Sequence, residues 1–185
     1  MIATSVLAES AATELYPVHP ANRGWEIERA HCADMADIKV LFRRLHAFNT
    51  ALDARFALSQ TWETPFEAAM QRVFRGEDAI CFIARDTRTG RPCAFALAAV
   101  HHDSDLWQYR EWVEVEALYV DDAWHGRGLA DDLLGHACAW AAGIEQPVVQ
   151  LYVTASNERA IHFYQHAGFR TTQEIMRKVL IEKML

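Results

Sequence analysis

Two glutamates, Glu114 and Glu116, stand two residues apart in an otherwise apolar stretch. Side chains two apart on a strand project to the same face, so we expect both carboxylates to share a face with Leu118 and Val120. A carboxylate in apolar surroundings has a raised pKa and can serve as a general base, and Glu116 lies closer to the end of the strand. In the alternative interpretation, both glutamates face solvent or pair with arginines such as Arg110.

Two glycines follow that strand, Gly126 and Gly128, immediately before an apolar helical segment. Glycines let the backbone approach a ligand closely, and the exposed amides of a first helical turn attract anions. The pattern therefore favours a phosphate or pyrophosphate site, although an isolated Gly-x-Gly is more often a plain turn. It is not a dinucleotide fingerprint, which needs a third glycine at Asp131, nor a P-loop, because no Gly-Lys-Ser/Thr closes the turn.

A second motif region runs from Asn157 to Phe169. Asn157 is a good helix N-cap, the next residues carry helical spacing, and Gly168 provides a stop. The segment ends in Tyr-x-x-x-Gly-Phe, which begins at Tyr164. A strand over residues 148–153 precedes it, so the chain reads as strand, glycine turn, helix, strand and short capped helix.

This order resembles the GNAT superfamily of acyl-CoA-dependent N-acyltransferases, and the resemblance covers about residues 25–185. The cofactor motif of that family, Arg/Gln-x-x-Gly-x-Gly/Ala, corresponds here to the segment from His125 to Ala130. His125 replaces the usual Arg or Gln. The cradle of backbone amides is unaffected by this departure, whereas a side-chain contact from position 125 is put in doubt.

The resemblance implies an α/β (α+β) fold with a mixed, mostly antiparallel sheet flanked by helices. Two parallel strands, ending near Val120 and Val153, would splay at the cofactor crevice, and acetyl-CoA would bind there as co-substrate. Pantetheine would lie between the strands, and the pyrophosphate would lie on the amides of residues 126–130. The cofactor-binding residues that the resemblance implies are Leu118, Tyr119, Val120, His125, Gly126, Arg127, Gly128, Leu129, Ala130, Asn157 and Tyr164.

The implied reaction is transfer of an acetyl group from acetyl-CoA to a primary amine of a small molecule by direct attack. An alkyl ammonium group has a pKa of about 10.4, so a base must remove its proton, and Glu116 or Glu114 is the candidate. A free backbone N–H near Leu118 would stabilise the oxyanion by about 3 kcal/mol. Tyr164 matches the general-acid tyrosine of the family, and its alternative role is packing beside Phe163.

Two other functions fit the same motifs. One is acyl transfer to a protein N-terminus or lysine, which a wide groove beside Glu116 would favour. The other is a non-catalytic acyl-CoA-binding regulatory module. A closed acceptor pocket walled by aromatic side chains would favour a small molecule, and the candidates for those walls are Phe56, Trp62 and Trp107.

Two helices are expected before the motif regions. Asp34 caps the first, which runs to about Phe48 with an apolar face. That face carries Met35, Ile38, Leu41, Phe42 and Leu45. Thr64-Pro65-Phe66-Glu67 reads as a capping box with proline at the first position, so the second helix starts at Pro65 and stops at Gly76.

The expected strands are residues 25–30, the hairpin 79–85 and 92–100, the strand ending at Val120, residues 148–153, and a last strand over 174–180. An antiparallel meander would therefore feed a right-handed strand–helix–strand crossover. We expect one domain over residues 25–185, preceded by an arm over residues 1–24.

Composition limits the classes of partner. The chain has 185 residues, 51% of them hydrophobic, and a formal net charge of −7 without a basic tract, so a nucleic-acid partner is not expected. No apolar run approaches the roughly 20 residues of a membrane span. Three of the four cysteines lie in apolar segments, which favours buried thiols in a cytoplasmic protein. His162 and His166 lack a third ligand, so no metal is expected, and a homodimer is compatible with the apolar last strand.

Overall fold

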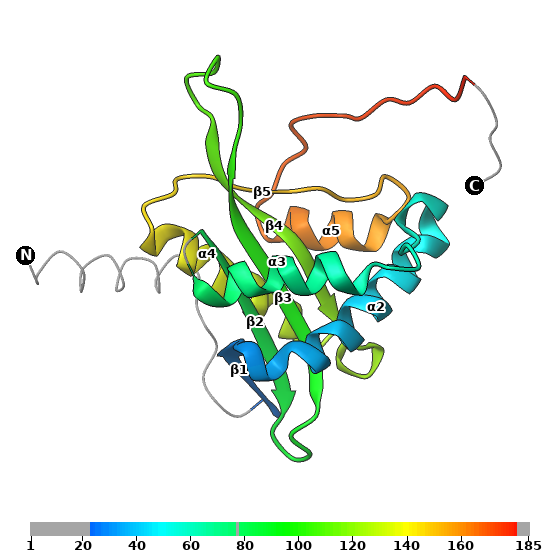
Figure 1. Ribbon diagram of the computed structural model, residues 1–185, viewed down its shortest axis with the longest axis vertical. Helices are drawn as coiled ribbons and strands as arrows, with labels where there is room; N and C mark the ends of the chain where they lie inside the picture. Colours follow the sequence, from blue (N-terminus) through cyan, green and yellow to red (C-terminus); the bar gives the residue numbers. More distant parts are fainter. Residues whose placement is uncertain (1–22, 77, 181–185) are drawn as a thin grey trace, which may run out of the picture.

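The computed structural model describes residues 23–76 and 78–180, and its centre is a five-stranded sheet in the chain order β1-β2-β3-β4-β5. The strands are β1 (Trp25–Arg29), β2 (Ala79–Asp86), β3 (Pro92–His102), β4 (Glu111–Val120) and β5 (Val149–Leu151). The first four pair antiparallel, and β5 is parallel to β4. The expected mixed, mostly antiparallel sheet is confirmed, and the β3–β4 hairpin projects beyond the body of the molecule (Figure 1).

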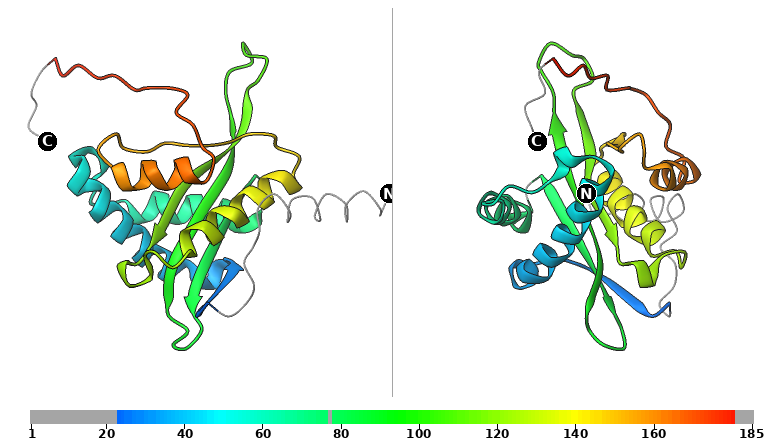
Figure 2. Two further views of the ribbon diagram at one scale, coloured as in Figure 1. Left: turned by 180° about the vertical axis from the view of Figure 1, so that it is seen from behind. Right: turned by 90° about the vertical axis from the view of Figure 1, so that its right-hand side faces the viewer.

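Helices cover both faces of this sheet (Figure 2). On one face lie α2 (Met35–Leu52) and α3 (Glu63–Arg75), and on the other α4 (Leu129–Gly143) and α5 (Glu158–His166). Each face has its own hydrophobic core: Ile83 and Phe95 belong to the α2–α3 core, and Leu133 belongs to the α4 core. The sheet is thus buried on both sides, as the apolar runs of β2 and β3 require.

The apolar face of α2 is confirmed, since Ile38 and Leu41 are fully buried and the other predicted members pack against the same core. Its start is confirmed, with Asp34 at the N-cap position, and a 3-10 turn over residues 32–34 precedes it. The Asp34 side chain makes no cap to the helix; it accepts the His31 N–H at 2.8 Å and pairs with Arg85. The helix also runs past Phe48 to Leu52.

The predicted capping box of the second helix is wrong. Helix α3 begins at Glu63, before Thr64, and Trp62 stands at its N-cap without a side-chain hydrogen bond. Glu67 does not reach back to the helix start because it pairs with Lys39 of α2, which also pairs with Glu63. Contacts between the two helices therefore decide where this helix begins. The stop at Gly76 is confirmed, with a φ of 73°.

The predicted last strand over residues 174–180 is also wrong, because residues 170–180 contain no strand. The three-residue β5 is the last strand of the sheet, and nothing described pairs with its outer edge. Without a neighbouring strand, the apolar side chains of this segment stay exposed, as Met176 does at 90% and Leu180 at 80%. The predicted N-terminal arm lies, except for its last two residues, outside the described residues.

A β-bulge in β4 changes the faces that its side chains occupy. Ala98 pairs with Val115 and Leu97 pairs with Ala117, so Glu116 is one residue extra on β4. Bulges shift the alternation of side chains along a strand. Before the bulge, Val115 belongs to the α4 core, and after it Ala117 belongs to the α2–α3 core.

The expected common face for the two glutamates and Leu118 is therefore wrong. Leu118 and Val120 pack on the α4 core. Glu114 lies between two residues of that core, Val113 and Val115, and so projects to the opposite face, toward α2 and α3.

The parallel pair β4–β5 is short. Its register runs only from Val113 opposite Val149 to Val115 opposite Leu151. Beyond that point, nothing described pairs with the β5-facing edge of β4, over residues 116–120. The sheet therefore opens on one side of β4 at the level of Glu116, directly before the glycine turn.

Candidate active site

The N-terminus of α4 forms a cradle of backbone amides. Gly126 and Gly128 have φ angles of 71° and 89°, a left-handed conformation that side chains rarely adopt. The first bond of the helix runs from the Asp132 N–H to the Gly128 carbonyl at 3.0 Å. Within the described chain, the N–H groups of residues 126–131 donate no backbone hydrogen bond, and no side chain caps the helix. Such a set of free donors at the positive end of a helix dipole suits an anion.

His125 is held by the protein through its ring nitrogen Nε2. Its Nε2 lies 2.8 Å from the Val120 carbonyl oxygen, and its Nδ1 lies 3.4 Å from a carboxylate oxygen of Asp122. The imidazole thus braces the end of β4 against the turn. One of the three backbone positions expected to bind the cofactor, Val120, therefore already has a partner for its carbonyl, whereas Leu118 and Tyr119 lie along the open edge of the strand.

The remaining motif residues line the turn in different ways. The guanidinium of Arg127 lies over the Trp124 ring, 5.1 Å from its centroid. Trp124 in turn meets Trp25 edge to face at 5.9 Å. Leu129 is fully buried in the α4 core, so only its backbone can face a ligand, and Ala130 packs against the same core.

Glu116 has the environment of a base. Its side chain reaches solvent, yet the surrounding protein raises its pKa, first through loss of water contact and second through the charge of Glu114. His101 and Arg72 act in the opposite direction. The carboxylate would thus bind a proton more readily than an ordinary glutamate, which a proton acceptor requires.

Glu114 differs from its neighbour. Its Oε2 is buried and has no hydrogen-bond partner in the described chain. Neither glutamate forms an ion pair with a described residue, and Arg110, one suggested partner, pairs with Asp105 instead. Most partly buried carboxylates on the α2 side, such as Asp34, do have a basic partner.

Tyr164 lies on α5 and packs against the α4 core, and Asn157 stands at the N-cap of the same helix. The N-cap role of Asn157 is confirmed, because its Oδ1 accepts the Ala160 N–H at 3.1 Å. The Tyr164 ring packs on Phe163 and Phe169, with centroids 5.1 and 5.8 Å away, and burial raises its pKa to about 12. Its packing role is thus real, and the phenol also keeps its proton at neutral pH, as a proton donor must.

The three aromatic residues expected to wall an acceptor pocket are not brought together. Trp62 stacks on Phe42 at 5.5 Å between α2 and α3, and no aromatic contact among the described residues joins it to Phe56 or Trp107. Trp107 is 59% exposed on the β3–β4 hairpin.

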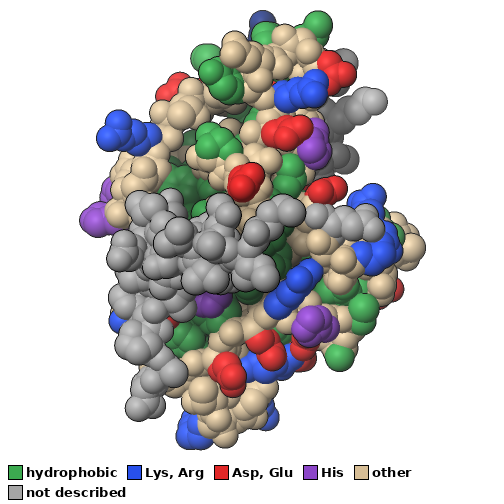
Figure 3. Space-filling model, turned by 90° about the vertical axis from the view of Figure 1, so that its left-hand side faces the viewer, with side chains coloured by type: hydrophobic (Ala, Val, Ile, Leu, Met, Phe, Trp, Pro, Cys, Tyr) green, Lys and Arg blue, Asp and Glu red, His purple; other side chains and the backbone are tan. Residues whose placement is uncertain are grey.

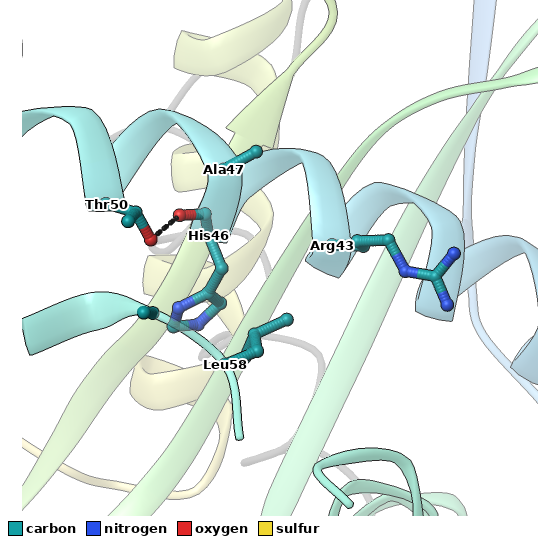
Figure 4. A pocket seen from close by; sticks show the side chains of 6 residues that line it. Arg43, His46, Ala47, Thr50 and Leu58 are labelled. Carbon is teal, nitrogen blue, oxygen red and sulfur yellow. Dashed lines mark hydrogen bonds between the residues drawn. The ribbon is translucent and has the colours of Figure 1, made fainter. Parts of the chain in front are cut away.

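A pocket that the sequence did not predict lies beside α2 (Figure 4). It has a volume of about 270 Å³ and is lined by Arg43, His46, Ala47, Thr50, Ala57 and Leu58. The Thr50 hydroxyl donates to the His46 carbonyl at 2.6 Å. None of the lining residues comes from β4, α4 or α5, so this pocket is separate from the glycine cradle.

One buried polar pair beside the cradle was also not predicted from the sequence. The Trp25 indole Nε1 donates to Asp132 Oδ2 at 3.0 Å, and both side chains are buried. The pair ties β1 to the first turn of α4. Its signal in the sequence is an aspartate within an apolar helix, because a buried carboxylate needs a partner.

The described residues give little support for catalysis by a thiolate or a metal ion. Burial raises the pKa of the Cys81, Cys93 and Cys138 thiols, so they resist forming thiolates. No three His, Cys, Asp or Glu side chains of residues 23–76 and 78–180 stand together as metal ligands would.

No described helix has both the length and the apolar character to cross a membrane. On the face in Figure 3, basic and acidic side chains are interspersed where the structure describes them.

Comparison with known proteins places this geometry in context. The model of the acetyltransferase (GNAT) family matches residues 45–169. An N-acetyltransferase of Methanocaldococcus jannaschii is 29% identical over 86 residues, which are 46% of this chain and 38% of that protein. Mycothiol acetyltransferase of Propionibacterium freudenreichii is 30% identical over 120 residues, 65% of this chain and 33% of that protein. The chain thus spans about a third of the length of these relatives.

Solved structures share the fold. A variant of the BH1408 protein from Bacillus halodurans has a TM-score of 0.72 and 21% identity, covering 84% of this chain and 99% of that one. An aminoglycoside N-acetyltransferase, AAC(6′)-Iy, was solved in complex with CoA; its TM-score is 0.68 and its identity 17%, over 84% of this chain and 93% of that one.

Proposed function

Because the chain belongs to the GNAT acetyltransferase family, whose model spans more than half of it, we propose that it transfers an acetyl group from acetyl-CoA to a primary amine of a small molecule. The observation that carries this proposal is the open edge of β4, which leads directly into the amide cradle of α4. A cofactor with an extended amide-bearing arm and a pyrophosphate needs those two features next to each other.

The residues present fit coenzyme A. The edge of β4 over residues 116–119 lacks a strand partner in the described chain and offers backbone groups to the pantetheine arm. Gly126 has nothing within 4 Å of the place where a Cβ would stand, so the turn leaves room for a phosphate. Asn157 uses its Oδ1 as a cap, and its amide nitrogen remains for the pantetheine arm. When bound, acetyl-CoA supplies the thioester that an amine attacks.

In this proposal, the protein's own groups move the protons. Glu116 takes the proton from the ammonium of the acceptor, which its raised pKa favours. A backbone N–H on the open edge of β4 stabilises the negative charge that develops on the carbonyl oxygen. Tyr164, a phenol that keeps its proton at neutral pH, gives that proton to the sulfur as the carbon–sulfur bond breaks.

A small-molecule acceptor is supported by one class of structural neighbours and by charge. The aminoglycoside N-acetyltransferases share the fold, and their names state that they act on aminoglycosides, which are amine-bearing small molecules. The net charge of −7 and the carboxylate pair without a basic partner favour a cationic acceptor.

The proposal is tested by incubating the chain with acetyl-CoA and a panel of small amines, lysine peptides and N-terminal peptides, and following free thiol. We expect thiol release with at least one small amine, together with a product heavier by one acetyl group. Release with peptides alone would identify a protein acetyltransferase. Thermal stabilisation by CoA with no release for any acceptor would identify a binding module and contradict the enzymatic proposal.

A further inference from the structure

The cradle of α4 has a neighbour from outside both motif regions, Arg23. A Cβ placed on Gly128 would stand 2.5 Å from Arg23 Nη1 and 3.8 Å from its Cζ, so the guanidinium lies directly against the N-cap of the helix. Arg23 lies two residues before the start of β1 at Trp25 and about 100 positions away in sequence from the glycine turn. Sequence motifs therefore give no sign of this contact.

The backbone next to Arg23 is fixed in place. Gly24 packs against Trp124, whose ring atoms would lie 3.6 Å from a Cβ at that glycine. The Gly24 carbonyl accepts the Thr87 N–H at 3.0 Å, and the buried Trp25 side chain donates to Asp132. The Trp25 bond thus joins β1 to α4, the Trp124 contact joins it to the turn before the glycines, and the Thr87 bond joins it to the β2–β3 turn, so that Arg23 is held beside the cradle.

The Arg23 guanidinium and the N-terminus of α4 place two positive groups side by side, and Asp131 and Asp132 in the first turn offset part of that charge. The N-terminus of a helix carries a partial positive charge, which repels a cation. In the described chain, Arg23 forms no ion pair, and neither Asp131 nor Asp132 binds it. The Asp132 carboxylate is turned to Trp25 instead. An anion between the guanidinium and the free amides would satisfy both sets of donors.

The side chains of the glycine turn itself are already in contact with other protein groups, so none of them is placed to bind a phosphate. His125 is engaged with Val120 and Asp122, and Arg127 lies over Trp124. We infer that Arg23 binds a phosphate group of the coenzyme A co-substrate at the N-terminus of α4, and so supplies the side-chain contact that His125 does not make. This inference rests on the proposed function, because it assumes that coenzyme A is the ligand of the cradle.

The test is calorimetric binding of three probes, CoA, dephospho-CoA and pantetheine, to the native chain and to Arg23→Gln. We expect Arg23→Gln to weaken CoA binding about tenfold, because the lost bond is charge-assisted, and Arg23→Lys to lose less. Pantetheine, which has no phosphate, should bind both chains equally. The matched control is Arg88→Gln on the β2–β3 turn, which should bind CoA within about twofold of the native chain.

The probes also locate the phosphate. If the loss persists with dephospho-CoA, Arg23 binds the pyrophosphate, and if it disappears, Arg23 binds the 3′-phosphate. Native-like CoA binding by Arg23→Gln would overturn the inference and leave the proposed function intact. An equal loss for pantetheine would also overturn it, since the substitution would then act through the fold. A native chain that binds none of the three probes would instead refute the proposed function itself.

Discussion

At the scale of single residues, the two glutamates of β4 differ in a way that their spacing does not reveal. Glu116 stands in a bulge, reaches solvent and has a raised pKa, whereas Glu114 has a buried oxygen without a partner. The presence of the pair on a strand that precedes the glycine turn was predictable, because alternation and the glycine turn are local patterns. The face of the sheet on which the two glutamates lie was not predictable, because the bulge depends on how β3 pairs with β4.

We predict that Glu116→Gln lowers kcat/KM by about 100-fold or more, because a positioned base contributes about that much. The base acts when deprotonated, so native activity should rise with pH through the raised pKa of Glu116, and the variant should lose that inflection. Glu114→Gln is the matched comparison and should lose less. Steady-state thiol release between pH 5 and 9 measures kcat/KM for both variants. A larger loss for Glu114→Gln would mean that Glu114, and not Glu116, is the base.

The same pKa shift provides a check on folding. A carboxyl whose pKa is raised in the folded state contributes stability that is lost as pH rises through that pKa. Glu116→Gln should therefore be at least as stable as the native chain at neutral pH in urea unfolding. A clear destabilisation would mean that the carboxylate supports the fold and that lost activity is indirect.

We predict that Tyr164→Phe lowers kcat about tenfold or more, since a positioned proton donor is removed while the ring still packs on Phe163 and Phe169. CoA affinity and the free energy of unfolding should change little. Single-turnover acetyl transfer separates this effect from product release. Native kcat in the variant would reduce Tyr164 to its packing role.

At the scale of elements, local patterns predicted which segments form helices and strands, and tertiary contacts decided several of their ends. The apolar faces of α2 and the N-cap of α5 were predictable because neighbouring residues set them. The start of α3 and the missing last strand were not, because Lys39 and the short β5 determine them from a distance.

The pair Trp25–Asp132 should couple β1 to α4. We predict that Asp132→Ala lowers the free energy of unfolding by about 2 kcal/mol, because it leaves the buried Trp25 N–H without an acceptor. Asp132→Asn keeps an acceptor oxygen and should recover most of that loss. A double-mutant cycle with Trp25→Phe in urea measures the coupling. Additive losses would show that the hydrogen bond carries no energy.

At the scale of the whole molecule, exposed apolar side chains gather on the β3–β4 hairpin, on residues 170–180 and on the residues that follow β5. In the segment 170–180, Ile175 is 75% and Met176 90% exposed, and next to β5 Tyr152 is 60% exposed. Exposed apolar residues beside an unpaired strand edge favour association. We therefore expect two copies to associate through the last two of these segments.

Sedimentation equilibrium tests this expectation. The native chain should be dimeric at micromolar concentration, and Ile175→Ser with Val179→Ser should shift it toward monomer. Leu106→Ser, on the equally exposed β3–β4 hairpin, is the control and should leave the dimer intact. A native chain that stays monomeric up to about 100 µM would contradict the expected dimer.

The central claim is that acyl-CoA binds where the open edge of β4 meets the cradle of α4. Backbone amide chemical shifts during a titration with acetyl-CoA test it most directly. We expect the largest shifts on residues 116–120 and 126–131, with small changes around the pocket of Arg43 and His46. Shifts concentrated at that α2 pocket, with the glycine turn unchanged, would contradict it.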